Sequence, residues 1–174
     1  MQIKCGTDLI QIERISRAIR RLGRSFLDRI WSAEEQADCL AAKSSDNGVS
    51  DDLNKGIVLT ASSASSLAAR FAAKEAAAKA LGTGIGPLGV CWTDIVIQRG
   101  PGIQGDSCTE IGAGDQPAGM TAPLVVLKGG ALRRYRQLGG ISICVSLSHE
   151  GGLALAYCVL LHDSNANANA PAGT

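Results

Sequence analysis

The Ala-rich stretch 67–81 carries charged side chains at spacings that could organise chemistry along one helix. Arg70 and Lys74 are four residues apart, as are Glu75 and Lys79, the latter in the order that favours an ion pair. Almost all other positions are alanine, so little of this helix can be bulky core, and a second backbone or a ligand can approach it closely. The pattern fits a surface helix with ordinary salt bridges, or one that presents its charges to an anion.

Glycines directly after this stretch could help to bind such an anion. The segment reads Gly82-Thr83-Gly84-Ile85-Gly86, and Gly82 is well placed to end the helix. Glycine lets backbone amides adopt turns that point at a negative charge. The segment lacks the Lys-Ser/Thr pair of a P-loop and the glycine spacing of a dinucleotide-binding fingerprint, so by itself it is a weak phosphate signal.

Residues 11–30 carry six arginines against two acidic residues, a charge of +4 in a chain of net charge +1. On a helix these residues form an apolar stripe with an arginine face almost opposite. A face of this kind is either simply solvated or binds an acidic partner, since arginine offers a rigid fork to carboxylates and phosphates. The stripe comprises Ile12, Ile15, Ile19, Leu22 and Phe26, and the arginine face comprises Arg14, Arg17, Arg21 and Arg24.

A histidine lies at the end of a predicted strand, in the segment Ser146-Leu147-Ser148-His149-Glu150. Neighbouring strand residues point to opposite faces, so Ser148 and His149 do not make a catalytic dyad by adjacency. The sequence also has no Gly-x-Ser-x-Gly nucleophile elbow. With hydroxyl neighbours, His149 suits a contact to an anion, and a hairpin histidine without a role fits the segment equally well.

The elements that would position these groups predict an α+β fold with a mainly antiparallel sheet packed with helices. Ser32 and Glu35 have the spacing of a capping box at the start of one helix. The predicted helices span about 11–30, 33–42, 67–81 and 131–138, and the predicted strands span 2–8, 90–98, 124–127, 141–148 and 153–161, the last two forming a hairpin.

Three segments fall outside this pattern of helices and strands. Residues 43–66 are rich in Ser, Asp, Asn and Gly and then form a Ser/Ala run, and residues 99–122 hold six Gly and two Pro. Both are expected to be surface insertions in a single domain spanning 1–162. The tail 163–174 is low in complexity and is expected to be disordered.

The composition is that of a soluble globular protein, with 45% apolar, 19% charged and 3% aromatic residues. The longest run without Asp, Glu, Lys or Arg is 14 residues, too short to cross a membrane, and the first ten residues contain no apolar signal-peptide core. We therefore expect a cytoplasmic protein. Six cysteines with no pair closer than fourteen residues favour reduced, mostly buried thiols over a zinc site.

Taken in order, several segments resemble holo-[acyl-carrier-protein] synthase, the short, single-half type of 4′-phosphopantetheinyl transferase. The combination of GTD near the N-terminus with RFAAKEA and KALGTG is highly specific, and the resemblance covers nearly all of the core. The segments are GTDLIQIERI at 6–15, RIWSAEE at 29–35, RFAAKEAAAKALGTGIG at 70–86, WTDIVI at 92–97, PLVVLKGGA at 123–131 and VSLSHE at 145–150.

The resemblance implies the half-fold of this family and a Mg²⁺-dependent reaction that moves the 4′-phosphopantetheine arm of coenzyme A to a serine of apo-acyl carrier protein, releasing adenosine 3′,5′-bisphosphate. Asp8 and Glu75 match the family's metal-binding carboxylates, and Lys79 matches its phosphate-contacting lysine. The proton acceptor stays open among Glu75, Lys79, His149 and water. The substrate-binding residues implied are Arg70, Lys74, Gly82, Gly84, Pro123, Ser146 and His149.

The same resemblance implies partners and assembly. The arginine face of 11–30 falls where the family meets acyl carrier protein, and the small half-fold implies a homotrimer with active sites between protomers, working in fatty acid biosynthesis. One rival interpretation is a non-catalytic protein whose basic helix binds nucleic acid or another polyanion. It leaves Asp8, Glu75 and the glycines after the helix unexplained. A second rival, a metal-dependent phosphohydrolase, gives the arginine face no role.

Overall fold

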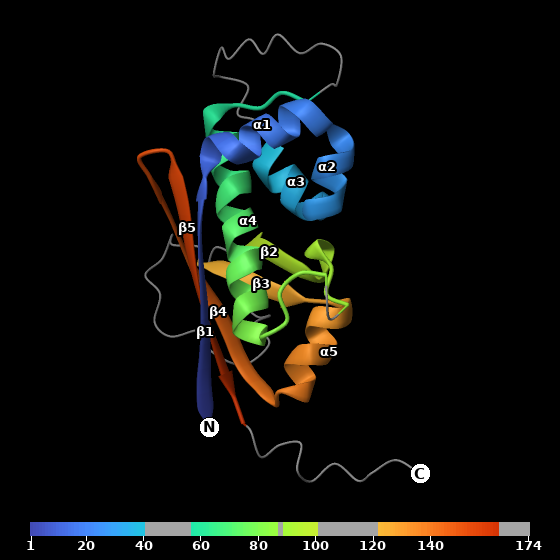
Figure 1. Cartoon of the computed structure of the whole chain (residues 1–174), viewed down its shortest axis with the longest axis vertical. Helices are drawn as coiled ribbons and strands as arrows, with labels where there is room; N and C mark the ends of the chain where they lie inside the picture. The colour runs from blue at the N-terminus through green and yellow to red at the C-terminus, as the bar shows by residue number, and fades with distance from the viewer. Residues whose placement is uncertain (41–56, 87–88, 101–121, 164–174) are drawn as a thin grey trace.

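The computed structural model describes residues 1–40, 57–86, 89–100 and 122–163 and confirms the α+β class (Figure 1). A long helix, α4, runs through the molecule with a three-stranded sheet along one side and the remaining elements on the others (Figure 1). The elements are β1 (Gln2–Gln11), α1 (Ile12–Leu22), α2 (Arg24–Ile30), α3 (Ala33–Leu40), α4 (Ala61–Leu81), the 3₁₀ turn η1 (Trp92–Asp94), β2 (Ile95–Arg99), β3 (Pro123–Leu127), α5 (Gly129–Gln137), β4 (Gly140–Glu150) and β5 (Leu153–His162).

Both sheets are antiparallel, as expected. The larger one has the strand order β1-β5-β4, and the smaller one pairs β2 with β3. The predicted β4–β5 hairpin is confirmed, and it turns at Gly151 and Gly152, whose φ angles of 57° and 79° lie in the region that favours glycine. In the larger sheet Asp8 of β1 pairs with Ala156 of β5, which in turn pairs with Leu147 of β4.

Alanines let α4 lie directly on this sheet. The alanines from Ala72 to Ala80 in α4 are at most 1% exposed. A Cβ added to Gly6 of β1 would fall 2.1 Å from the carbonyl oxygen of Ala76 and 2.9 Å from Cβ of Lys79. The strand backbone therefore contacts the helix backbone at Gly6, the close approach that the small side chains of α4 indicated.

The predicted helix over 11–30 is wrong as a single helix, because Gly23 breaks it. Gly23 has φ 64° and ψ −144°, and its amide donates to Ile19 of α1, so the chain changes direction between α1 and α2. The apolar stripe is correspondingly shorter than expected: Ile15, Ile19 and Phe26 are buried, but Leu22 is 43% exposed.

The predicted boundary of the first insertion is also wrong. Residues 61–66 belong to α4, where Ser63 and Ala64 are buried, and Thr60 caps the helix by accepting a hydrogen bond from the Ser63 amide. The Ser/Ala run that resembled a low-complexity segment is the first part of this helix. Residues 43–56 of that prediction lie outside the described residues.

The ends of several other helices and strands differ from the predicted ends by a few residues. The first strand continues past Asp8 to Gln11, and β2 begins at Ile95 instead of residue 90, because Trp92–Asp94 form a 3₁₀ turn. Arg99 belongs to β2, and the Gly100 amide donates to the carbonyl oxygen of Ala122, so a hydrogen bond joins the two ends of the second predicted insertion. The rest of that insertion, the end of the predicted 33–42 helix and the tail after Asp163 lie outside the described residues.

The thiols are more exposed than the sequence led us to expect. Among the described cysteines only Cys39 and Cys158 are buried, whereas Cys5, Cys91 and Cys144 are exposed, so the expectation of mostly buried thiols is wrong. In the part of the chain that the structure describes, no helix is long and apolar enough to span a membrane.

Candidate active site

A carboxylate and an ammonium meet where β1 crosses α4. Lys79 Nζ donates to Asp8 Oδ1 at 2.8 Å and to the carbonyl oxygen of Thr7 at 2.8 Å. The Asp8 side chain is only 18% exposed, and that of Lys79 is 47% exposed. The contact depends on the close approach at Gly6, two residues before Asp8. The expected ion pair of Lys79 is thus made with Asp8 on the strand instead of with Glu75 on its own helix.

Glu75 is the second carboxylate of this cluster, and its pKa is raised above the usual value. Burial is the largest cause, the negative charge of Asp8 raises the pKa further, and the positive charge of Lys79 lowers it. The structure therefore brings Asp8 and Glu75, 67 residues apart in sequence, close enough to repel each other. A cation between them would remove that repulsion.

The donor set suits a hard divalent cation that carries other ligands with it. The acidic side chains that interact here are those of Asp8 and Glu75. In the described residues no group of three His, Cys, Asp or Glu side chains is arranged to hold a metal ion. Mg²⁺ is usually held by one or two carboxylates, with water and phosphate oxygens in the remaining positions. The residues present fit that ion.

A cavity of about 440 Å³ lies between the two sheets beside α4. It brings together Arg70, Pro123 and Ser146, three of the residues expected to bind substrate. Its other lining residues were not singled out from the sequence, because strand positions next to a Gly-rich segment carry no local signal of a cavity. The lining consists of Arg70, Ile97, Gln98, Arg99, Ala122, Pro123, Val145, Ser146 and Leu147.

Arg70 is fixed at this cavity by three contacts. Its Nε donates to the carbonyl oxygen of Ile97 at 3.1 Å, one terminal nitrogen donates to Ser66 Oγ at 2.8 Å, and the other lies 3.3 Å from Asp38 Oδ2. The side chain is 7% exposed. Arginine has five N–H donors, so two remain for an anion in the cavity.

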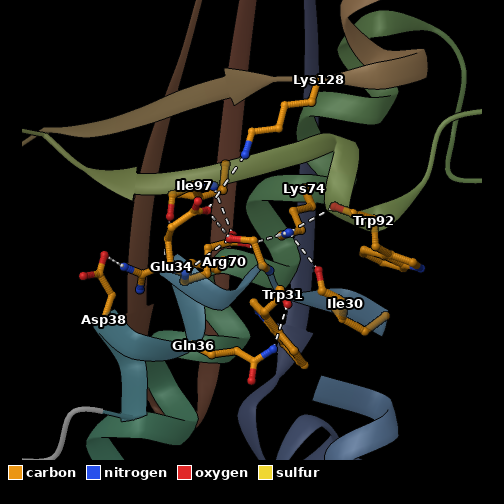
Figure 2. Close-up of polar contacts among 12 residues, drawn as sticks. Ile30, Trp31, Glu34, Gln36, Asp38, Arg70, Lys74, Trp92, Ile97 and Lys128 are labelled. Atoms are coloured by element: carbon orange, nitrogen blue, oxygen red, sulfur yellow. Dashed lines mark hydrogen bonds and ion pairs between the residues drawn. The ribbon is translucent and has the colours of Figure 1, made fainter. Parts of the chain in front are cut away.

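Lys74 does not contribute to this cavity, and its expected role as a phosphate contact is wrong. Its side chain is fully buried, and Nζ donates to Glu35 Oε2 at 2.7 Å and to the carbonyl oxygens of Ile30 and Trp92 (Figure 2). These bonds use all three of its N–H donors. Burial lowers the pKa of Lys74, and the adjacent Glu35 carboxylate opposes that shift.

The backbone amides that follow α4 donate hydrogen bonds to the last turn of the helix. Gly82, with φ 71°, ends the helix as predicted, and its amide donates to Lys79. The amides of Thr83 and Gly84 donate to the carbonyl oxygen of Ala78. The expectation that the amides of Gly82 and Gly84 point at an anion is therefore wrong.

His149 lies apart from the residues that it was expected to join. It is exposed near the end of β4, three residues beyond Ser146, which places the two about 10 Å apart along the strand. The described lining of the cavity includes Ser146 but not His149.

The arginine face is exposed, and acidic side chains lie next to two of its arginines. Arg17 lies 3.9 Å from Glu13, and Arg24 lies 3.1 Å from Asp28. Arg24 also belongs to α2, beyond the break at Gly23. On α1 itself Arg14, Arg17 and Arg21 are exposed.

The cavity and the carboxylates occupy different sides of α4. Arg70 and Glu75 are five residues apart, so their side chains point about 140° apart around the helix. Arg70 faces β2, whereas Glu75 and Lys79 face Asp8 on β1. Within this chain the helix lies between the two groups.

Known proteins share this chain's sequence pattern and its fold. A family model, the 4′-phosphopantetheinyl transferase superfamily, matches residues 4–111. The holo-[acyl-carrier-protein] synthase of Herpetosiphon aurantiacus is 36% identical over 159 residues, covering 88% of this chain and 94% of that protein. The protein of the same name from Ruminiclostridium cellulolyticum is 36% identical over 168 residues, covering 96% of this chain and 98% of that protein.

A solved structure extends the likeness to the fold. The Helicobacter pylori holo-[acyl-carrier-protein] synthase, in complex with coenzyme A, superimposes with a TM-score of 0.61 at 27% identity, covering 90% of this chain and 99% of that one. The family resemblance that the motifs carried is thereby confirmed. This chain belongs to the 4′-phosphopantetheinyl transferase superfamily, in its holo-[acyl-carrier-protein] synthase family.

Proposed function

We propose that this chain transfers the 4′-phosphopantetheine arm of coenzyme A to a serine hydroxyl of apo-acyl carrier protein and releases adenosine 3′,5′-bisphosphate. The observation that carries the proposal is the carboxylate pair of Asp8 and Glu75 beside Lys79, in a chain of this family. We infer that the holo-carrier protein formed in this reaction serves fatty acid biosynthesis and that the enzyme works in the cytoplasm.

Asp8 and Glu75 would hold Mg²⁺ together with the pyrophosphate of the coenzyme. When bound, the ion supplies positive charge that stabilises the charge developing on the phosphate oxygens during transfer. The protein's own contribution is to keep two carboxylates at one place despite their repulsion, which the positive charge of Lys79 beside Asp8 partly offsets. Lys79, half exposed beside Asp8, is placed to contact the phosphates from the same side.

The cavity beside Arg70 would bind the nucleotide part of the coenzyme. Arg70 and Arg99 supply positive charge for its phosphates, and the Ser146 hydroxyl supplies a further polar contact. Pro123 and Leu147 give the cavity apolar surface against which a base can pack. His149 lies apart from the lining of the cavity, so it is tested after Arg70, Pro123 and Ser146.

The arginine face of α1 would bind the carrier protein, an acidic helical partner. Arg14→Glu with Arg21→Glu should lower the apparent affinity for carrier protein about tenfold and flatten its salt dependence, because like charges would then face each other. The kinetic constants for carrier and for coenzyme A measure this separately, and the coenzyme constant should stay near that of the parent.

A matched control is Arg133→Glu with Arg136→Glu, which makes the same charge change on the exposed side of α5. If both double variants affect carrier binding equally, the effect is one of net charge and the proposed docking face is wrong. If the parent binds RNA and Arg14→Glu with Arg21→Glu weakens that binding as much as it weakens carrier binding, the polyanion-binding alternative is favoured.

Two observations support a homotrimer with active sites between protomers. The face of the larger sheet turned away from α4 carries exposed apolar side chains, among them Ile3, Leu9, Leu155 and Tyr157 at 70%, 59%, 42% and 47% exposure. In addition, α4 separates the cavity from the carboxylates, so one coenzyme would reach both groups most directly if they came from neighbouring protomers.

Mixing two defective variants tests this arrangement. Asp8→Asn disables the carboxylate pair, and Arg99→Glu disables the cavity, so each variant alone should be nearly inactive. If each site combines the carboxylates of one protomer with the cavity of the next, random mixed trimers should recover about a quarter of parental activity. No recovery in mixtures that have exchanged protomers would place both groups in one protomer's site.

The reaction class is tested by the dependence of nucleotide release on the carrier. We expect adenosine 3′,5′-bisphosphate to appear only when coenzyme A and apo-carrier protein are both present. Release that proceeds equally without carrier would favour the phosphohydrolase alternative.

A further inference from the structure

The strand β2 is an edge strand whose buried polar groups face the helices instead of another strand. In the β2–β3 ladder, Gly100 donates to Ala122 and Lys128 donates to Asp94, which places the even-numbered residues of β2 at the hydrogen-bonded positions. The N–H and C=O of Ile97 therefore point away from β3. Ile97 is 1% exposed, so these groups need partners within the protein.

Two charged side chains from different helices supply those partners. The Ile97 amide donates to Glu35 Oε1 of α3 at 3.0 Å, and Arg70 Nε of α4 donates to the Ile97 carbonyl oxygen at 3.1 Å. We call Glu35 and Arg70 the β2 clamp, because together they hold both backbone groups of one strand residue. Figure 2 shows Arg70 beside Ile97.

The clamp is itself held rigidly. Glu35 Oε2 accepts hydrogen bonds from Lys74 Nζ at 2.7 Å and from the Ser32 amide at 2.9 Å. The side chains of Glu35 and Lys74 are both 0% exposed. A buried carboxylate with three donors in fixed positions has one orientation available, so Ile97 is held in one place.

The clamp acts on a wall of the cavity. Ile97, Gln98 and Arg99 line one side, Val145–Leu147 of β4 line the opposite side, and Arg70 lies beside both. The two sides belong to different sheets, so no backbone ladder joins β2 to β4. The hydrogen bonds to Ile97 help to set how far apart the two sides lie.

We propose that Glu35 is a positioning residue for coenzyme binding, acting through the amide of Ile97 to hold the β2 wall at the distance from β4 that the nucleotide requires. The inference rests on the proposed function, in which this cavity takes the nucleotide. Glu35 does not touch the cavity, and its capping-box position explains only its bond to Ser32. The bonds to Lys74 and Ile97 go beyond what helix capping needs.

A pair of double variants separates positioning from the stability of the buried ion pair. Both contain Lys74→Met, so neither leaves an unpaired buried ammonium. In Glu35→Gln/Lys74→Met the amide oxygen still accepts from Ile97, whereas Glu35→Met/Lys74→Met has a side chain of similar length without an acceptor. The two proteins differ mainly in whether the Ile97 amide has a partner.

The dissociation constant for coenzyme A, measured with Mg²⁺ present, should be about tenfold larger for Glu35→Met/Lys74→Met than for Glu35→Gln/Lys74→Met. The kcat values of the two at saturating coenzyme should agree within about twofold, because the wall affects binding and not the transfer itself. Equal dissociation constants, or a difference confined to kcat, would overturn the inference and leave the proposed function intact. A parent enzyme that fails to bind coenzyme A would overturn both.

A measurement on the parent alone gives a second test that does not depend on the folding of either variant. If the clamp and the coenzyme favour the same wall position, each stabilises the other, so coenzyme A should slow hydrogen exchange at the Ile97 amide. Exchange at Ile97 that is unchanged at saturating coenzyme would contradict the inference.

Discussion

Asp8→Asn and Glu75→Gln should each lower the rate of phosphopantetheine transfer about a hundredfold or more, because either change removes a negative charge that would hold Mg²⁺ beside the pyrophosphate. The amides keep the shape of the side chains. Turnover measured over a titration of Mg²⁺ tests the prediction. A variant that keeps near-parental turnover at low Mg²⁺ would show that its residue is not a metal ligand.

The two variants should differ in the stability of the metal-free protein. The raised pKa of Glu75 means that its ionised form costs folding free energy at pH values above the usual glutamate pKa. Glu75→Gln should therefore leave the metal-free protein as stable as the parent at neutral pH, or more stable. Asp8→Asn weakens the ion pair with Lys79. Because the Lys79 side chain is half exposed, the loss of folding free energy should be at most about 1 kcal/mol. Thermal melts without metal compare the two.

Gly6→Ala should destabilise the protein by about 3 kcal/mol, the upper part of the range for overpacked cores. The added methyl would lie 2.1 Å from the carbonyl oxygen of Ala76, which is backbone and cannot move aside alone. Transfer should also fall in the protein that remains folded, because β1 must shift away from α4 and carry Asp8 away from Lys79 and Glu75. Denaturant unfolding and turnover per folded molecule measure the two effects.

Gly151→Ala is the control for this substitution. Gly151 has φ 57° and nothing within 4 Å of an added Cβ, so its change should cost only the left-handed backbone penalty of roughly 1 kcal/mol. If Gly6→Ala costs no more than Gly151→Ala, the backbone contact between β1 and α4 is looser than the structure indicates.

Features that local pattern determines were predictable from the sequence. The alternation over residues 141–148 predicted β4, and the two glycines that follow predicted the hairpin to β5. Gly82 ends α4 as its position after an Ala-rich helix indicated. In each case the signal lies within a few residues of the feature that it predicts.

Other features depend on residues that are distant in sequence, and these were missed. The burial of Lys74 requires Glu35, which lies 39 residues earlier, and nothing near Lys74 distinguishes it from the half-exposed Lys79. The close approach of Gly6 to Ala76 was missed for the same reason, because it exists only once β1 packs on α4. Residues 61–66 were misassigned because a Ser/Ala run has the composition of a linker, and burial of Ser63 is a tertiary effect.

The resemblance to a family located the carboxylates, and the structure refined what surrounds them. Asp8 and Glu75 came from matched motifs, and their proximity in the fold is one cause of the raised pKa of Glu75, after burial. Gln98, Arg99 and Leu147 enter the site only through the cavity. Glu35, first recognised as a capping residue, enters through its hydrogen bond to Ile97.

Mass spectrometry of apo-acyl carrier protein, incubated with this chain, coenzyme A and Mg²⁺, tests the central claim most directly. We predict that the carrier gains the mass of one phosphopantetheine on its serine, and that Asp8→Asn under the same conditions produces almost no gain. A folded parent protein that leaves the carrier mass unchanged, with a carrier that another phosphopantetheinyl transferase does modify, would contradict the account.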